Sequence, residues 1–422
     1  MANNLNSNVT RQLARVFLEK FEASRVLCKA VDTQLLSGKF SPKSGSTVDF
    51  KRPHDYNTLR TAGGDISSST KSDIISGKAT GTVQDYFTVA TEWGNVEEAL
   101  ELDQLDQILA PMATRMVTAL ELDLGLFMLK NLGLSYGAPG TAVDAWSDVA
   151  GAGSLMEAIG VPSDDLCYVM TPFTEQNLAD AQSALASGSN DLVDSAWGRA
   201  QIKRNFAGMR VMSSNALKTI TTGTTSDRAG AINGTPVATY VAHKDIMIQD
   251  IPVDGLTASG TIKAGEIVEI TGRFYLSQST REQFLGADGS QVKFRGVVTE
   301  DVTLASGAGT LKVAGPAIFE ANGQYNTVSA ALADGDVVTL LGAASTVYQP
   351  NMFFHKKAVG LGTVKLPKLY ATDTVATTED GFSIRISKYA DGDSNQQKVR
   401  FDMLPAFACF NPFFGGQGFG VA

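Results

Sequence analysis

Apolar residues recur at every third or fourth position in two parts of the chain, and this spacing predicts two helices. The first covers residues 9–31, with repeated apolar positions such as Phe17. The second begins near Val96 and continues to Phe127, with Pro111 inside it. We expect the proline to kink this helix or to start a second one. Beyond the proline the segment is apolar on most sides, so we expect it to form the covered spine of a domain.

Residues 222–346 have a different pattern, in which short alternating apolar and polar runs are separated by glycine-containing turns. The clearest run is 251–272, and its local pattern recurs at 335–340. Joints rich in Thr, Gly and Ser flank the block at 219–226 and 342–346. Such alternation and turns are typical of β-hairpins. The pattern therefore predicts a β module that is inserted into a host domain.

Two strand-like runs, 47–51 and 82–90, enclose a long polar segment. Its middle part, 61–70, is rich in Gly and Ser and has little to pack with. A hairpin of this length cannot bury itself within one molecule. It is either a mobile surface loop or an arm that becomes ordered on a neighbouring subunit.

The rest of the chain mixes helices with strands, so the host is predicted to be α+β. Helices are expected at 154–159 and 174–186. Strands are expected at 166–170, 209–213, 351–359, 382–387 and 398–404. Because the last three strands follow the insert, we expect the chain to return to the same host domain after it.

The composition describes an ordered protein and limits its partners. The chain has 422 residues, of which 43% are hydrophobic and 19% charged, and this is enough for two or three domains. Its net charge of −9 disfavours a sequence-reading nucleic-acid binder, although it is compatible with a protein that encloses nucleic acid. The polar N-terminus does not read as a signal peptide, and no apolar run reaches the roughly 18 residues that a membrane span needs. We therefore expect a soluble protein.

No sequence motif predicts a catalytic residue, a cofactor or a metal, because the phosphate-loop, zinc-protease and hydrolase signatures are all missing. The histidines lie far apart in sequence, and we expect them at the surface: His54, His243 and His355. The cysteines have no C-x-x-C spacing, and we expect them to be buried small side chains in a reducing cytoplasm: Cys28, Cys167 and Cys409.

Two segments imitate binding motifs. Residues 391–402 resemble the start of a calcium loop, but Gln396 stands where that loop requires Gly, so we predict a hairpin turn. The tail 415–420 imitates a dinucleotide fingerprint without the strand, turn and helix that such a site needs. The acidic residues are numerous, so a pair of catalytic carboxylates stays an open alternative.

Three segments carry a resemblance to a known family. They are Ala142–Ala150 (AVDAWSDVA), Thr257–Glu266 (TASGTIKAGE) and Asn351–Val359 (NMFFHKKAV). Together with the order of the predicted elements, they resemble the major coat proteins of short-tailed temperate phages (podoviruses) of enteric bacteria. The resemblance covers essentially the whole chain. It implies the fold that tailed-phage and herpesvirus capsids share, here with an inserted antiparallel β-barrel, the I-domain.

The resemblance also implies a domain organisation. The expected parts are an N-terminal arm (1–43), an extended hairpin or E-loop (44–91), a P-domain with the spine helix (92–144), the first part of an A-domain (145–221), the inserted β-barrel or I-domain (222–346), and a return to the A- and P-domains with the C-terminal tail (347–422).

By the same resemblance, the expected function is that of a major capsid protein without enzymatic activity. Copies of the chain would assemble into hexamers and pentamers of an icosahedral head in the host cytoplasm, with a scaffolding protein and a portal as partners. The head would enclose double-stranded DNA without reading its sequence, and neither a cofactor nor a membrane would be involved.

Other readings stay open. A secreted adhesin or carbohydrate-binding protein would need an export signal, and a glycosidase would need a deep cleft with two carboxylates. A capsid-like protein compartment would have the same fold but hold no DNA.

Charge is unevenly distributed near the two predicted helices. Residues 1–43 have a net charge of +4, and residues 92–106 contain six acids and no base. We hypothesise that the arm docks on acidic surface of an adjacent subunit through these residues: Arg11, Arg15, Lys20, Arg25 and Lys29. The acidic candidates are Glu92, Glu97, Glu98, Glu101, Asp103 and Asp106. The alternative is that both sets are solvated helix faces.

Overall fold

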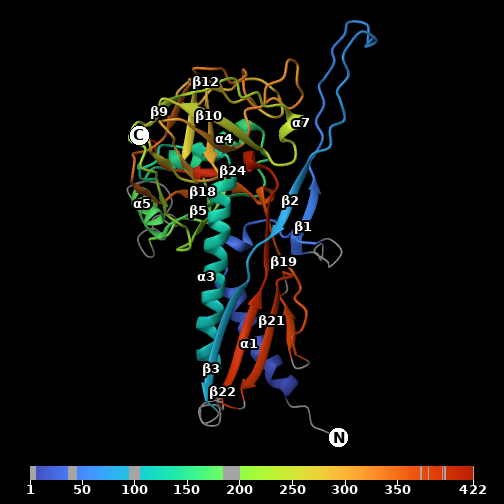
Figure 1. The fold of residues 1–422 in the computed structure, drawn as a ribbon, viewed down its shortest axis with the longest axis vertical. Helices are drawn as coiled ribbons and strands as arrows, with labels where there is room; N and C mark the ends of the chain where they lie inside the picture. The colour runs from blue at the N-terminus through green and yellow to red at the C-terminus, as the bar shows by residue number, and fades with distance from the viewer. Residues whose placement is uncertain are drawn as a thin grey trace. The chain divides into compact units, whose positions relative to one another are not determined.

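A computed structural model describes residues 6–36, 45–94, 105–183, 200–370, 373–378, 380–391, 393 and 396–421. The chain divides into two compact units (Figure 1). Unit 1 consists of Met1–Asp49, Gly81–Gly125 and Val359–Ala408. Unit 2 consists of Phe50–Thr80, Leu126–Ala358 and Cys409–Ala422. Each unit is therefore assembled from segments that lie far apart in the sequence.

Unit 1 is built on an antiparallel sheet with a helix packed against it. The strand order is β20 (Thr374–Thr377), β21 (Ser383–Asp391), β22 (Gln396–Met403) and β3 (Phe87–Gly94). Helix α1 (Asn6–Ser24) contributes two fully buried rings. Phe17 stacks on Phe401 with 4.1 Å between ring centroids, and Phe21 meets Phe382 edge-on at 5.9 Å. The apolar face that predicted this helix is thus the face that covers the sheet.

Helix α3 (Leu105–Asn131) is continuous through Pro111, so the expectation that the proline would start a second helix is wrong. Within unit 1, a side chain of this helix, Glu121, binds the backbone of the turn that follows α1. The Glu121 carboxylate accepts hydrogen bonds from the backbone N–H groups of Val26, at 2.5 Å, and Cys28, at 3.3 Å. Burial raises the pKa of Glu121, while these bonds and Arg25 oppose the rise.

A second four-stranded sheet follows the order β1 (Thr47–Lys51), β2 (Lys78–Val83), β23 (Pro405–Cys409) and β19 (Val359–Thr363). Short 3₁₀ turns, η1 (Leu27–Lys29) and η2 (Gln34–Leu36), follow α1. The backbone of Asp32 exchanges hydrogen bonds with Val359 and Leu361 of β19. The segment after α1 is therefore bound to a strand from the last quarter of the chain.

The host part of unit 2 centres on a six-stranded sheet. Its order is β4 (Leu134–Tyr136), β24 (Gly415–Gly418), β18 (Asn351–His355), β5 (Leu166–Met170), β7 (Met209–Ser213) and β6 (Asn205–Phe206). Every residue of β5 and β18 is buried, as expected for a strand covered on both faces. Helix α4 (Trp146–Ile159) packs on β4 and β24, and α5 (Pro172–Ser183) follows β5.

The glycine-rich tail that imitated a nucleotide fingerprint is a buried strand, β24. A Cβ atom on Gly416 would lie 1.9 Å from the carbonyl oxygen of Leu134, and one on Gly415 would lie 2.6 Å from Phe354. These glycines allow three strands to approach closely.

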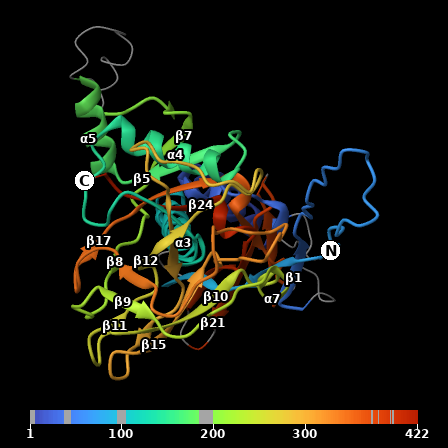
Figure 2. The same cartoon turned by 90° about the horizontal axis from the view of Figure 1, so that it is seen from above.

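The insert forms a closed antiparallel barrel. Its order is β10 (Ile248–Asp254), β15 (Gly309–Ala314), β13 (Lys293–Val298), β12 (Ile267–Phe274), β16 (Val337–Leu340) and β9 (Ala229–Ile232). Alternate residues of β10, such as Ile251 and Val253, are buried, which is the period that predicted the strands. Helix α5 lies away from β9 in both views (Figure 1 and Figure 2), and Figure 2 also shows it away from β15.

The two ends of the insert meet. Strand β8 (Ile220–Thr221) pairs with β17 (Val347–Tyr348) in antiparallel fashion. Smaller elements complete the insert: β11 (Thr261–Ile262) pairs with β14 (Val302–Thr303), and helix α7 (Tyr240–His243) precedes β10. The barrel therefore leaves and re-enters its host at one place.

We predict that Asp402→Asn destabilises unit 1 at neutral pH but not in strong acid. Arg385 donates to the Asp402 carboxylate at 2.6 Å, and Arg400 and Thr88 also donate to it. Burial alone would raise the pKa of Asp402, but these hydrogen bonds hold it below its ordinary value. A lowered folded-state pKa contributes stability above the unfolded-state value, near 3.8, and this stability is lost as the pH falls further.

Urea unfolding of the unassembled chain should show a loss of about 3–5 kcal/mol at pH 7, the usual result of breaking a buried ion pair. The difference from the wild type should shrink in titrations continued below pH 3.8. A difference that stays constant across this range would contradict the role assigned to the carboxylate.

Candidate functional site

Residues 53–76 form an extended ribbon that projects past α7 in both views (Figure 1 and Figure 2). Almost every residue of its outer part, 58–71, is exposed. Four large apolar side chains along the ribbon are exposed too, up to 76% for Ile74: Tyr56, Leu59, Ile66 and Ile74. The part of the chain that the structure describes does not bury these side chains.

The root of the ribbon, in contrast, is fixed by a buried arginine that the sequence reading missed. Arg52 donates from Nε to the carbonyl oxygen of Lys78, at 3.1 Å, and from Nη1 to that of Phe410. Its backbone N–H donates to the carbonyl of Gly77 at 2.9 Å. Burial lowers the pKa of Arg52. The ribbon thus has a rigid base and an exposed tip.

The basic residues of the predicted arm do not form one surface. Arg15 and Lys29 are exposed, and Lys20 is half-buried on α1. Arg11 also lies on α1, but its side chain is outside the described part of the structure. Among the predicted basic residues whose side chains the structure describes, the exposed charges are therefore those of Arg15 and Lys29.

Arg25 is an internal anchor of unit 1. Its side chain is 2% exposed and lies 2.5 Å from Asp380. The guanidinium also stacks over the ring of Phe382, 4.7 Å from the centroid. Sequence reasoning could not find this pairing, because the two charged residues are separated by most of the chain.

Of the predicted acidic residues, only Glu92 has a described side chain. It lies on β3, 3.4 Å from Lys398 of the neighbouring strand β22. Asp106 is in the first turn of α3, and its side chain is not described. The remaining four candidates lie outside the described residues: Glu97, Glu98, Glu101 and Asp103. Neither contact found here, Arg25 with Asp380 or Glu92 with Lys398, joins the basic set to the acidic set.

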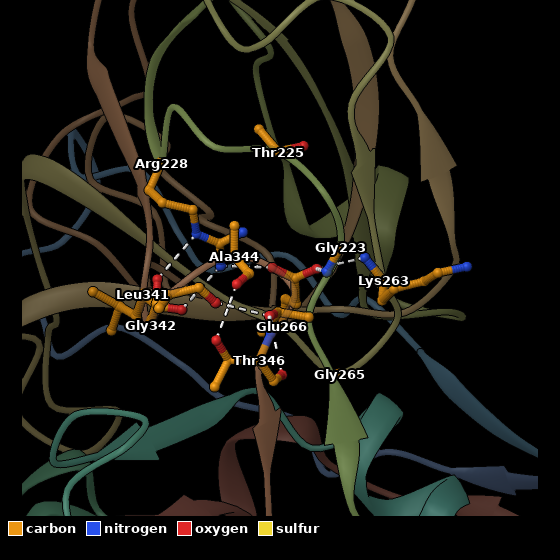
Figure 3. Close-up of polar contacts among 12 residues, drawn as sticks. Gly223, Thr225, Arg228, Lys263, Gly265, Glu266, Leu341, Gly342, Ala344 and Thr346 are labelled. Atoms are coloured by element: carbon orange, nitrogen blue, oxygen red, sulfur yellow. Dashed lines mark hydrogen bonds and ion pairs between the residues drawn. The ribbon is translucent and has the colours of Figure 1, made fainter.

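The most completely bonded carboxylate of the insert lies at its joints (Figure 3). Glu266 has a fully buried side chain, and its Oε1 accepts from the backbone N–H groups of Gly223, at 2.7 Å, and Lys263, at 2.6 Å. Its Oε2 accepts from Arg228 at 2.7 Å. One barrel side chain therefore binds the segment that enters the insert.

The segment that leaves the insert is bound by the same group of residues. Arg228 donates to the carbonyl oxygens of Leu341 and Gly342, each at 3.1 Å. Thr222 exchanges backbone and side-chain hydrogen bonds with Thr346. We call Glu266, Arg228 and Thr222 the joint clasp. The Thr- and Gly-rich composition of the joints indicated their place in the sequence, but nothing in it marked Glu266.

Gly223 is required where the clasp meets the barrel. A Cβ atom there would lie 1.9 Å from the carbonyl oxygen of Thr261, which is backbone and has no room to move. The glycine lets the entering segment pack against β11 and places its own N–H on Glu266.

Among the described residues, no group of three or more His, Cys, Asp or Glu could hold a metal ion. Asp391 pairs with Gln396 across β21 and β22, as the hairpin predicted in place of a calcium loop requires, while residues 392, 394 and 395 lie outside the described residues. No helix in the described ranges has the length and apolarity of a membrane span.

One histidine differs from its expected surface position. His355 is 1% exposed because it ends the buried strand β18, and burial lowers its pKa. The cysteines agree with expectation: Cys28 and Cys167 are buried, Cys409 is mostly covered, and burial raises the pKa of all three thiols.

Comparison with known proteins gives concordant findings. A family model described as "P22 coat protein - gene protein 5" matches residues 1–420. A protein named "Major capsid protein", from Acyrthosiphon pisum secondary endosymbiont phage 1, is 44% identical over 423 residues, which cover all of both chains.

Solved structures are similar at lower identity. "Capsid structure of the Cyanophage P-SCSP1u" has a TM-score of 0.46 at 10% identity, covering 94% of this chain and 89% of that chain. "Mycobacterium phage Che8" also has a TM-score of 0.46, at 12% identity, covering 93% and 90%.

We predict that Glu266→Gln loosens the barrel from its joints. The amide can accept on one side only, so either Arg228 or the pair of backbone N–H groups loses its partner. The free energy of unfolding should fall by about 3 kcal/mol, as expected for a broken buried pair. Thermal unfolding of the full chain measures this loss. Glu300→Gln is the matched control, because Glu300 pairs with Lys312 on the barrel surface and should change stability little.

Proposed function

The chain belongs to the P22 coat protein family and is a phage major capsid protein, and from this premise we propose how it builds the head. Copies of the chain assemble into hexamers and pentamers of an icosahedral shell that encloses double-stranded DNA. Capsid proteins self-assemble and are components of the virion, and the family is one of structural proteins. The capsid fold with an inserted barrel, predicted from the sequence, is confirmed.

The observation that carries the proposal is the ribbon, whose root is fixed and whose apolar side chains are exposed. We infer that its tip becomes buried on a neighbouring copy. An arm that buries about 1,000 Å² of apolar surface gains on the order of 25 kcal/mol, before the costs of ordering and association. Contacts of this size make subunits dependent on one another without a covalent link.

The finer organisation is part of the proposal. The N-terminal arm is 1–43, the E-loop 44–91, the P-domain 92–144, the A-domain begins at 145–221, the I-domain is 222–346, and 347–422 return to the host. Units 1 and 2 of the structure do not correspond one to one with these domains. What supports the I-domain boundaries is that β8 and β17 pair where the insert begins and ends.

The partners follow from the same reading. We propose a scaffolding protein and a portal as partners during assembly in the host cytoplasm, and a short-tailed temperate phage of enteric bacteria as the source. The net charge of −9 disfavours sequence-specific DNA binding and is compatible with a shell that encloses DNA. Membership of the P22 coat protein family favours a capsid protein over an adhesin or a glycosidase. A DNA-free compartment differs only in its content.

Electron microscopy of the purified protein tests the function directly. We expect closed icosahedral shells to form from the chain together with its scaffolding partner, and DNA to be present in shells isolated from infected cells. A protein that stays monomeric at high concentration with that partner would contradict the proposal. Shells that never contain DNA would favour the compartment.

We predict that reversing the exposed arm charges, Arg15→Glu with Lys29→Glu, slows shell formation. The hypothesis that the arm docks on acidic surface of an adjacent subunit requires these charges, whereas solvated faces do not. Arg25 is omitted, because its loss would break its pair with Asp380 and lower the stability of unit 1, which would confuse an assembly measurement.

Light scattering should show an assembly rate lower by about tenfold at low salt, with the difference shrinking as salt screens the charges. Glu19→Lys is the matched control, because Glu19 is exposed on the same helix as Arg15 and its reversal makes the arm more basic. Wild-type assembly of the double variant would favour the solvated-face alternative.

A further inference from the structure

Both legs of the ribbon rest on loops of the barrel in the same subunit. On the outgoing leg, Asp55 forms an ion pair with Arg281, and its backbone N–H donates to the Tyr325 hydroxyl at 3.2 Å. Further out, the Asn57 side chain donates to the carbonyl oxygen of Asn322 at 2.7 Å. The barrel therefore contacts this leg at three points within three residues.

The barrel also contacts the returning leg, opposite its contacts with residues 55–57. The side chain of Gln324 donates to the carbonyl oxygen of Asp73 at 2.8 Å, and the backbone N–H of Lys78 donates to Asp245 at 3.2 Å. Between them, Gly77 approaches α7 so closely that a Cβ atom would lie 2.9 Å from the carbonyl oxygen of Lys244. The close approach brings the leg against the barrel backbone itself.

The legs are also tied to each other at this level. The Asn57 N–H donates to the Ser72 hydroxyl at 2.8 Å, and the ring of His54 lies 3.1 Å from the carbonyl oxygen of Ile75. Beyond Asn57 and Ser72 the ribbon is almost wholly exposed. The barrel contacts thus end where the free tip begins.

The barrel side of this contact is itself rigid. The rings of Tyr240 and Tyr325 stack with 3.6 Å between centroids, joining the two loops that touch the legs. Arg281 has a left-handed backbone, with φ of 59°, and its guanidinium also donates to the carbonyl oxygen of Asn326 at 2.9 Å. The surrounding structure holds Arg281 in a sparsely populated backbone conformation, and the hydrogen bonds of its guanidinium orient the side chain toward the ribbon.

We propose that this surface is a clamp by which the inserted barrel aims the assembly arm of its own subunit. The clamp consists of Arg281, Gln324 and Tyr325, with Asp245 and the carbonyl oxygen of Asn322. It contacts the two legs of the ribbon and the adjoining start of β2 at Lys78. It orients the exposed tip before a second copy arrives, so that less conformational freedom is lost on assembly. This role rests on the proposed function, because it concerns an arm that docks on another copy.

Three variants of the full chain test the clamp. Arg281→Asn and Asp55→Asn each remove the ion pair, and Asn tolerates the left-handed backbone at 281. The swap of Asp55→Arg with Arg281→Asp restores opposite charges with the signs exchanged. Lys312→Asn is the matched control, because it removes a cation paired with Glu300 on the barrel surface, and the structure places none of its contacts on the ribbon.

Hydrogen exchange of the unassembled chain should become about tenfold faster in peptides covering 52–57 and 73–78 of the two single variants, because the loss of a charged hydrogen bond opens this region locally. Strands β10 and β12 should keep their protection. The assembly rate should fall by about tenfold, and the swap should recover most of both effects. The control should match the wild type in both measurements.

The outcomes separate the clamp from the function. Unchanged exchange in both single variants, or faster exchange with a wild-type assembly rate, overturns the clamp while shells still form. Wild-type protein that forms no shells overturns the proposed function instead, because the exchange result is read on unassembled chains. If Arg281→Asn loses the thermal transition of the barrel, Asp55→Asn decides, because it changes no barrel residue.

Discussion

Pairing between strands that are distant in sequence holds each unit of this protein together. In unit 1, β3 binds β22 along its whole length, so residues 87–94 are paired only when residues 396–403 are in place. In unit 2, β5 binds β18 across the entire insert. Closing such long loops costs entropy that grows with the logarithm of loop length. The sheet that α1 covers through Phe17 and Phe401 exists only after this return.

The joint clasp reduces that cost. Because β8 pairs with β17, the chain on either side of the insert emerges from adjacent positions. Once the barrel has closed, the host strands β7 and β18 are separated by a short effective loop instead of the residues between 221 and 347. The buried Glu266 with Arg228 makes this arrangement specific, because a displaced joint would leave a buried charge without its partner.

The local pattern of apolar and polar residues predicted many of the helices and strands. It could not predict contacts between residues that are far apart in the sequence. The period of α1 and the alternation of β10 arise from one-sided burial, which the sequence displays directly. Strand β24 was missed because glycine carries no strand signal, and its role depends on how closely Leu134 approaches Gly416. Arg25 was assigned to an external contact because its partner, Asp380, can be identified only in three dimensions.

The ribbon requires a compromise that the same reasoning explains. An arm that is flexible throughout would lose conformational entropy at every ordered residue when it docks, whereas an arm buried throughout would have nothing to offer a neighbour. Here Arg52 fixes the root, the barrel contacts reach as far as Asn57 and Asp73, and the tip beyond them carries exposed side chains such as Ile66. The entropy of the root is therefore lost during folding of the subunit, and assembly has to order only the tip.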